Sequence, residues 1–350
     1  MLMFFVYFIL AGIILVSFWT ISHNICWKEA GVQLVLQTVL ILVLSFFIKD
    51  AHLSDTELLN GRVTSKQSER VSCQHSYSCN CRNVCTGTGP SRTCSRVCDT
   101  CYEHPYDIAW RVYDNVGRRT TISRVDRRGL REPPRWTEVQ IGDPVSHLNR
   151  YTNYIKADPD SLFRITNANL DLDSFPNYPQ RIYDYYKVDR LVTDLELDRN
   201  MWNKKISEIN ADIGPAVQAN LIVVIKNKPS ISYATELQRA WEGGKKNDII
   251  LVIGSDGNKV RWSEIIGLAY PDFKVVLRNR VNDYRKIDIG LLDVVKETIL
   301  ENFKRRPMSD FEYLKESYKP TLYEWLFGAF ISSLLAIGLG FVFHKNNFFK

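Results

Sequence analysis

The sequence predicts a membrane-anchored α/β protein, and three observations lead to that prediction. Apolar runs lie near both ends of the 350-residue chain, whereas the middle is polar and charged. Seven of the eight cysteines fall between Cys73 and Cys101, which indicates a cross-linked or metal-binding module. Two short apolar runs, residues 219–225 and 248–253, are typical of strands that are buried on both faces of a sheet.

Three segments are candidates for transmembrane helices, because a helix needs roughly 20 apolar residues to cross a bilayer core. Residues 1–22 and 323–343 satisfy this requirement. Residues 32–48 are shorter and include Gln33 and Gln37, so a buried core helix is a stronger alternative there. The first segment has no basic residue before its apolar run and no evident cleavage site, and we therefore expect it to be retained.

The charges of the short segments predict which side of the membrane the body occupies. With three spans, the loop around Lys28 and the tail after residue 343 lie on the side opposite the body, and both contain lysine. Cytoplasmic loops are enriched in lysine and arginine, so we expect an extracytoplasmic body, whether periplasmic, luminal or extracellular. Five basic residues on the body side of the last span argue the reverse: Lys304, Arg305, Arg306, Lys315 and Lys319.

Between the spans, the sequence divides into four parts. Residues 49–72 are polar and are predicted to form a stalk with a short helix at 55–59. Residues 73–146 are predicted to form a Cys-rich β module that contains a hairpin at 106–125. Residues 147–188 are predicted to be an irregular connecting region, and residues 189–306 an α/β domain. Within the connecting region, 167–173 faintly resembles a calcium loop but lacks its glycine and late glutamate.

The Cys-rich segment fits two kinds of cross-link. Two tetrahedral zinc sites need eight ligands, and seven cysteines with one histidine supply that number. Disulfides instead are expected in an oxidising compartment. They would leave one of the seven thiols unpaired, because Cys26, the eighth cysteine, lies on the other side of the membrane in this topology. An extracytoplasmic body favours disulfides and a cytoplasmic body favours zinc. The residues concerned are Cys73, Cys79, Cys81, Cys85, Cys94, Cys98, Cys101 and His104.

The last part of the body alternates between helical and strand patterns. Residues 197–213, 232–241 and 289–303 have helical spacing, whereas 219–225, 248–253 and 260–266 read as strands. Strands that alternate with helices predict a layered α/β domain.

The stretch ANLIVVI…YATELQRAWEGGKKNDIILVIGSDGNKVRWSEI resembles the TPM domain family over about residues 189–306. The resemblance implies a membrane-anchored domain outside the cytoplasm, weak phosphatase activity, and a divalent cation such as Ca²⁺ or Mg²⁺ held by acidic residues. The corresponding acids here are Asp194, Asp256 and Asp272, for which turn and capping roles are the alternative. The chain has IIGLAYPDF where the family has a glycine-rich segment with a glutamate.

These features favour an accessory or scaffold protein that contacts the lipid bilayer and another membrane or membrane-surface protein. The alternative is a weak metal-dependent phosphatase acting on phosphate esters. The net charge of +6 is spread over interspersed acids and bases, so the sequence does not indicate nucleic-acid binding. No Ser/His/Asp or Cys/His nucleophile pattern stands out in the sequence, and it does not by itself define an enzyme.

Overall fold

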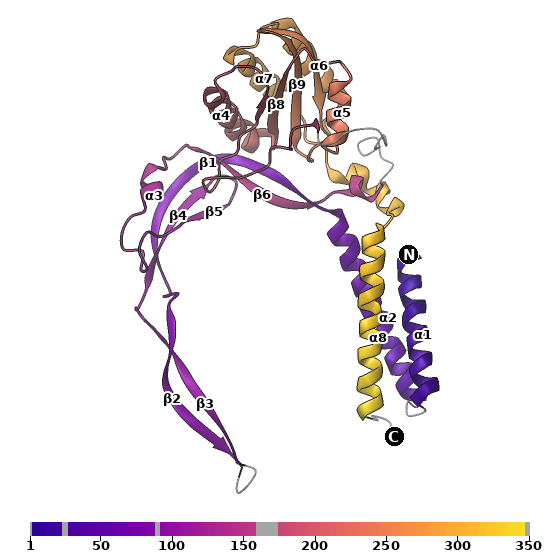
Figure 1. The fold of residues 1–350 in the computed structure, drawn as a ribbon. Helices are drawn as coiled ribbons and strands as arrows, with labels where there is room; N and C mark the ends of the chain where they lie inside the picture. The colour runs from indigo at the N-terminus through magenta and orange to yellow at the C-terminus, as the bar shows by residue number, and fades with distance from the viewer. Residues whose placement is uncertain (1, 23–26, 88–91, 159–173, 347–350) are drawn as a thin grey trace.

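The computed structural model describes residues 2–22, 27–87, 92–158 and 174–346. Figure 1 shows an arch with an α/β domain at its crown. A long β-ribbon descends on one side of the arch and a bundle of helices descends on the other. The Cys26 position and the 167–173 segment lie outside the described residues.

The α/β domain is built on a four-stranded sheet of order β10-β9-β8-β7. Strands β7, β8 and β9 run parallel, and β10 pairs antiparallel with β9. The apolar runs predicted as buried strands are β8 and β9, which confirms that prediction. The bounds are β7 Leu191–Thr193, β8 Asn220–Asn227, β9 Asp248–Asp256 and β10 Lys259–Ile266.

Helices cover both faces of this sheet, which explains why its central strands are apolar throughout. One face packs against α4, α6 and α7 and the other against α5. The sequence analysis missed α6, although Phe273, Leu277 and Val281 recur at four-residue spacing and are buried. The helix bounds are α4 Arg199–Val217, α5 Tyr233–Ala240, α6 Pro271–Tyr284 and α7 Ile289–Asn302.

The arch itself is an antiparallel sheet of order β5-β4-β1-β6, with the short helix α3 (Pro134–Glu138) beside it. Its longest strand pairs with β6 along its first half and with β4 along its second half. The hairpin predicted at 106–125 is β4 and β5, which confirms that prediction. The strand bounds are β1 Ser54–Val71, β4 Asp107–Asp114, β5 Arg119–Ile122 and β6 Pro144–Thr152.

The predicted stalk at 49–72 and its short helix at 55–59 are wrong, because this segment is the end of α2 followed by the strand β1. The segment reads as polar because several of its buried side chains, including Glu57 and Asn60, are themselves polar and find partners in the α/β domain. The β module therefore begins at Ser54 rather than at residue 73. It also extends through β6 into the predicted connecting region, where η2 (Tyr154–Ala157) follows.

Three helices form the bundle: α1 Leu2–Ser22, α2 Trp27–Leu53 and α8 Leu322–Asn346. Among the described residues, α2 and α8 are long and apolar enough to cross a membrane. The second helix is longer at both ends than the 32–48 segment predicted from sequence. Figure 1 shows α1 beginning at the end of the bundle nearest the body, and α8 ending at the far end.

The bundle is apolar outside and partly polar inside. Phe46, Phe47 and Phe330 are each more than 60% exposed, whereas Gln33 and Gln37 are buried between helices. The Ser332 hydroxyl also points inward and donates to a backbone carbonyl of α1. Large contiguous apolar surfaces on a protein mark contact with a membrane or with another protein.

Direct contacts fix the body to the bundle without an intervening linker. The His52 ring contacts Glu324 Oε1 through Nδ1 at 2.7 Å and the Lys156 carbonyl through Nε2 at 2.9 Å. The Asn153 backbone N–H donates to the Leu53 carbonyl at 2.7 Å. A 3₁₀ segment, η4 (Met308–Ser317), leads from the α/β domain to α8 and packs against η2. These contacts tie the end of α2, the start of α8 and η2 together.

Candidate functional site

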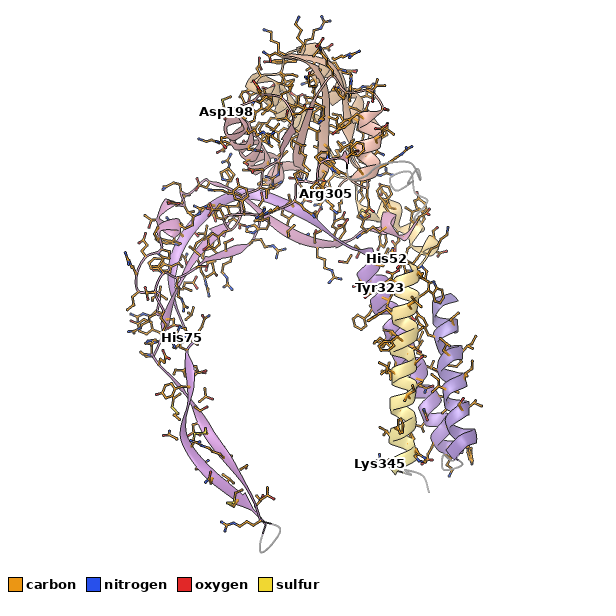
Figure 2. The ribbon with its side chains drawn as sticks, viewed as in Figure 1. His52, His75, Asp198, Arg305, Tyr323 and Lys345 are labelled. Carbon is orange, nitrogen blue, oxygen red and sulfur yellow. A yellow bond between two sulfur atoms is a disulfide. The ribbon has the colours of Figure 1, made fainter. Side chains whose placement is uncertain are left out.

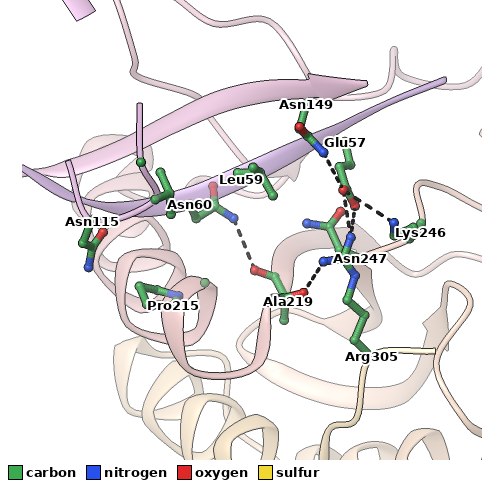
Figure 3. A pocket seen from close by; sticks show the side chains of 14 residues that line it. Glu57, Leu59, Asn60, Asn115, Asn149, Pro215, Ala219, Lys246, Asn247 and Arg305 are labelled. Carbon is green, nitrogen blue, oxygen red and sulfur yellow. Dashed lines mark hydrogen bonds and ion pairs between the residues drawn. The ribbon is translucent and has the colours of Figure 1, made fainter. Parts of the chain in front are cut away.

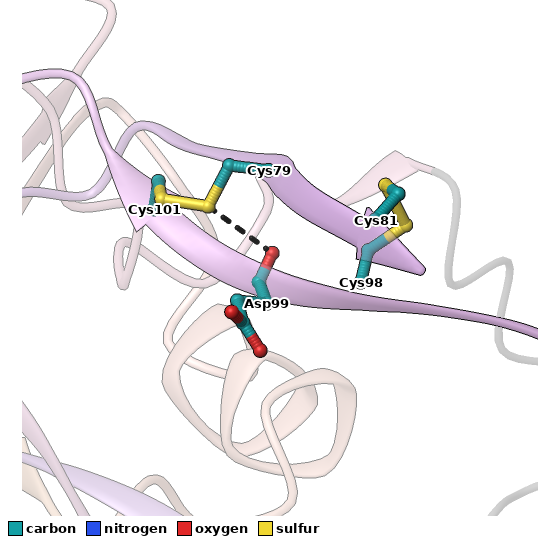
Figure 4. Close-up of a disulfide and its surroundings, with 5 residues drawn as sticks. All are labelled: Cys79, Cys81, Cys98, Asp99 and Cys101. Atoms are coloured by element: carbon teal, nitrogen blue, oxygen red, sulfur yellow. Dashed lines mark hydrogen bonds between the residues drawn. A yellow bond between two sulfur atoms is a disulfide. The ribbon is translucent and has the colours of Figure 1, made fainter. Parts of the chain in front are cut away.

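The ribbon that descends from the arch is a two-stranded hairpin of β2 (Ser76–Thr86) and β3 (Thr93–Tyr102), which we call the arm. Three disulfides join its strands, and Figure 4 shows two of them side by side. They are Cys79–Cys101, Cys81–Cys98 and Cys85–Cys94. Of the two alternatives left open by the sequence, disulfides therefore hold for these six cysteines, and two four-ligand zinc sites do not.

The arm is exposed along most of its length. Within the described part of the chain, its two strands pair only with each other, so both outer edges are open. Tyr77, Val84, Val97 and Tyr102 are each at least 40% exposed. Residues 80–98 contain three arginines and no acidic residue, so the outer part of the arm is basic. Disulfides take the place of a hydrophobic core in such a ribbon.

At the neck, where the arch narrows to the arm, three side chains with metal-ligating atoms converge. Cys73 Sγ lies 3.4 Å from His104 Nδ1. Asp107 Oδ1 lies 3.6 Å from the same nitrogen. The ligand atoms of all three residues lie within 4.8 Å of one another, and this is the one such group of three or more within the described ranges. Figure 2 labels the neighbouring His75 at this level of the ribbon.

The position of each side chain follows from the strands. Cys73 lies between the end of β1 and the start of β2, His104 lies between β3 and β4, and Asp107 is the first residue of β4. The sequence analysis named Cys73 and His104 but missed Asp107. The available signal was the position of Asp107, three residues after His104 and at the start of an apolar strand. A buried acid is rare unless it is paired, so this position indicated a partner for the carboxylate.

A cleft of about 500 Å³ separates the arch from the α/β domain, and Figure 3 shows its walls. Glu57 on β1 is buried there and accepts two hydrogen bonds from Arg305 Nη2, at 2.8 and 2.6 Å. Asn149 Nδ2 donates to the same carboxylate at 3.1 Å, and Lys246 Nζ lies 3.9 Å away. The polar and charged side chains around the Glu57 carboxylate thus pair with it. These contacts connect β1 to the segments that follow α5 and α7.

A second buried network lies beside this cleft and joins the same two units. The fully buried Arg190 donates to Asn60 Oδ1 at 2.6 Å, to Ser146 Oγ at 2.7 Å and to Asn220 Oδ1 at 2.9 Å. Burial lowers the pKa of Arg190 to about 10. Burial also raises the pKa of Asp248, which accepts from Asn220 in the same network. These contacts form a buried joint between the arch and the α/β domain.

The three acids assigned from the TPM resemblance are not brought together. Asp194 follows β7 and lies 2.9 Å from Lys226 Nζ, and Asp256 ends β9 with its carboxylate 3.4 Å from Lys228 Nζ. Partial burial would raise the pKa of Asp194, but the Lys226 ammonium holds this pKa below its ordinary value. Asp272 follows β10. Because β10 runs antiparallel to β9, Asp272 lies at the opposite end of the strands from Asp194 and Asp256.

Two regions therefore stand out as candidate functional sites. The arm offers an exposed, basic and covalently braced surface, and the neck gathers a thiol, an imidazole and a carboxylate. Comparisons of the chain with protein-family models, with curated proteins and with solved structures find no match.

Proposed function

We propose that this chain is an integral membrane accessory protein that holds its body outside the cytoplasm and uses the arm to bind another membrane protein. The exposed arm is the observation that carries this proposal. The bundle α1, α2 and α8 would cross the bilayer as three helices. The α/β domain would brace the arch that carries the arm.

Two features support the membrane location and the sidedness. The outward face of the bundle is apolar, and its polar side chains point inward, as expected for helices in lipid. The three disulfides are typical of oxidising compartments outside the cytoplasm. The disulfides agree with the lysines in the short loop and tail, which favour a cytoplasmic location for those segments.

The open edges of the arm support a protein as its partner. Each strand of the ribbon presents unpaired backbone groups at its outer edge, which are a template for pairing with another chain. The 11 residues of β2 span roughly 36 Å, so each edge of the arm is long enough to pair with a whole strand of a partner. The arm and the bundle descend in the same direction from the crown (Figure 1). The open edges of the arm thus offer a partner protein a long template for backbone pairing.

The α/β domain supports the accessory role more than an enzymatic one. A mixed sheet covered by helices on both faces is compatible with the TPM-like fold, which we retain as part of the proposal. The phosphatase alternative would need carboxylates that converge on one metal ion. The placement of Asp194, Asp256 and Asp272 gives it no support.

Photo-crosslinking in native membranes tests this proposal. A photoreactive residue at Val84 or Val97 on the arm should cross-link to a discrete integral membrane protein. Ile231, which is 78% exposed on the α/β domain, is the matched control position. Replacing Arg82 and Arg96 together by glutamate should abolish the arm cross-links. Equal cross-linking yields from the arm and from the control position would refute the proposal.

A further inference from the structure

We propose that Cys73, His104 and Asp107 bind one Zn²⁺ ion at the neck of the arm. This inference concerns a metal site and is independent of the partner proposed for the arm. Seven cysteines lie in the Cys-rich segment, and six of them are paired. The seventh, Cys73, is buried and faces an imidazole and a carboxylate rather than another sulfur.

The spacing of the three ligand atoms fits a tetrahedral zinc ion. Zinc binds sulfur, nitrogen and oxygen at about 2.0–2.3 Å, so neighbouring ligands of a tetrahedral site lie roughly 3.3–3.8 Å apart. The sulfur-to-nitrogen and nitrogen-to-oxygen distances here are 3.4 and 3.6 Å. These two distances match the separations that such an ion would impose, and all three ligand atoms lie within 4.8 Å of one another.

One oxygen of the Asp107 carboxylate accepts hydrogen bonds, and the other faces the position proposed for the zinc ion. Its side chain is fully buried, and Oδ2 accepts from the Gln74 backbone N–H and from Arg124 Nη1, both at 2.9 Å. Oδ1 points toward His104 Nδ1 and makes no hydrogen bond within the described residues. A buried carboxylate oxygen without a hydrogen bond is costly, and a metal ion at this position would satisfy it.

The same geometry argues against a catalytic triad. In a nucleophile–histidine–acid relay, the nucleophile and the acid contact different ring nitrogens. Here Cys73 and Asp107 both approach Nδ1 of His104, so no proton can pass through the ring between them. A cation shared by the three atoms explains the convergence on one nitrogen.

The donor set selects zinc. Thiolate disfavours Ca²⁺ and Mg²⁺, whereas a thiolate, an imidazole and a carboxylate together suit Zn²⁺. The His75 backbone N–H points at Cys73 Sγ at 3.4 Å and would stabilise a thiolate there. A cavity of about 490 Å³ adjoins Cys73 and His104 and leaves room for water as a fourth ligand.

Zinc at this position would clamp the arm to the arch. Its ligands come from the chain entering the arm and from the chain leaving it, which also meet through hydrogen bonds from the Glu103 N–H to the His75 carbonyl and from the Gln74 N–H to Asp107. Ligation would also keep the seventh thiol from oxidation in a compartment that oxidises the other six. The ion would thus fix the angle at which the arm leaves the arch.

Metal analysis of the full-length protein in detergent tests the site. After equilibration with Zn²⁺ and removal of free metal, the wild type should retain about one ion per chain, and Cys73→Ser and Asp107→Asn less than about a tenth of that. His75→Gln is the matched control, because His75 is in the same neck but its Nε2 contacts the Arg127 carbonyl. It should retain the wild-type content.

Two measurements on the wild type keep the test decisive even if a variant misfolds. Replacement of zinc by Co²⁺ should give a sulfur-to-cobalt charge-transfer band. Alkylation of Cys73 should accelerate at least about tenfold when a chelator removes the metal. A wild type without the cobalt band, equal zinc in the Cys73→Ser variant, or a Cys73-linked dimer on a non-reducing gel would each overturn the proposal.

Discussion

Removing the carboxylate of Glu57 should loosen the joint between the arch and the α/β domain. The side chain is 1% exposed and accepts two hydrogen bonds from Arg305, whose own side chain is 19% exposed. Breaking such a buried pair from one side leaves an uncompensated charge and typically costs about 3–5 kcal/mol. The residual exposure of Arg305 lets water compensate in part. We therefore expect Glu57→Ala to lower the free energy of unfolding by about 3 kcal/mol.

Glu208→Ala is the matched control for this prediction. Glu208 pairs with Arg62 at 2.9 Å in the same joint, but the two side chains are 40% and 30% exposed. Solvent screening reduces such a pair to about 0–1 kcal/mol. Guanidinium unfolding of the detergent-solubilised chain, followed by tryptophan fluorescence, compares the two variants. Equal stabilities for Glu57→Ala and Glu208→Ala would refute the view that the buried pair holds the joint.

Three further predictions follow from the packing and the charges. Gly214→Ala should destabilise the protein by roughly 1–3 kcal/mol in the same unfolding assay despite better helix propensity, because a Cβ there would overlap the backbone of β1. Gly328→Ala should weaken the packing of α1 on α8, because the added Cβ would overlap the Tyr7 ring. Gly338→Ala is the control, because a Cβ there meets open space. The yield of cross-linking between α1 and α8 compares the two variants. Burial would raise the pKa of Asp55, but hydrogen bonds from Lys245 and Asn153 hold this pKa below its ordinary value of 3.8. Asp55→Asn should therefore be less stable than wild type near pH 6, and pH-dependent thermal unfolding should show the difference shrinking as the pH falls below 3.8.

Much of the α/β domain could be predicted because its signals are local. Strands β8 and β9 are continuous apolar runs, and the helices around them repeat apolar residues at helical spacing. Strand β1 could not be predicted in the same way, because its identity depends on distant partners. Glu57 and Asn60 look like surface residues until Arg305 and Arg190 are brought beside them.

The neck cluster shows the same limit. Cys73 and His104 were visible as candidate ligands because the residue types are rare and clustered. Asp107 was hidden, since an aspartate at the start of a strand reads as turn chemistry. Its burial depends on how β4 pairs with the end of β1, which is a tertiary feature. Pairing of the six arm cysteines likewise required the hairpin register, in which Cys85 lies opposite Cys94.

The central claim is that the bundle lies in the membrane while the disulfide-braced arm lies outside the cytoplasm. Labelling of the arm cysteines in sealed vesicles with the cytoplasmic face outward measures this directly. After reduction with a membrane-permeant agent, an impermeant thiol reagent should leave Cys85 and Cys94 unmodified until the vesicles are opened with detergent. Modification of these cysteines in the sealed vesicles would place the arm in the cytoplasm and contradict the account.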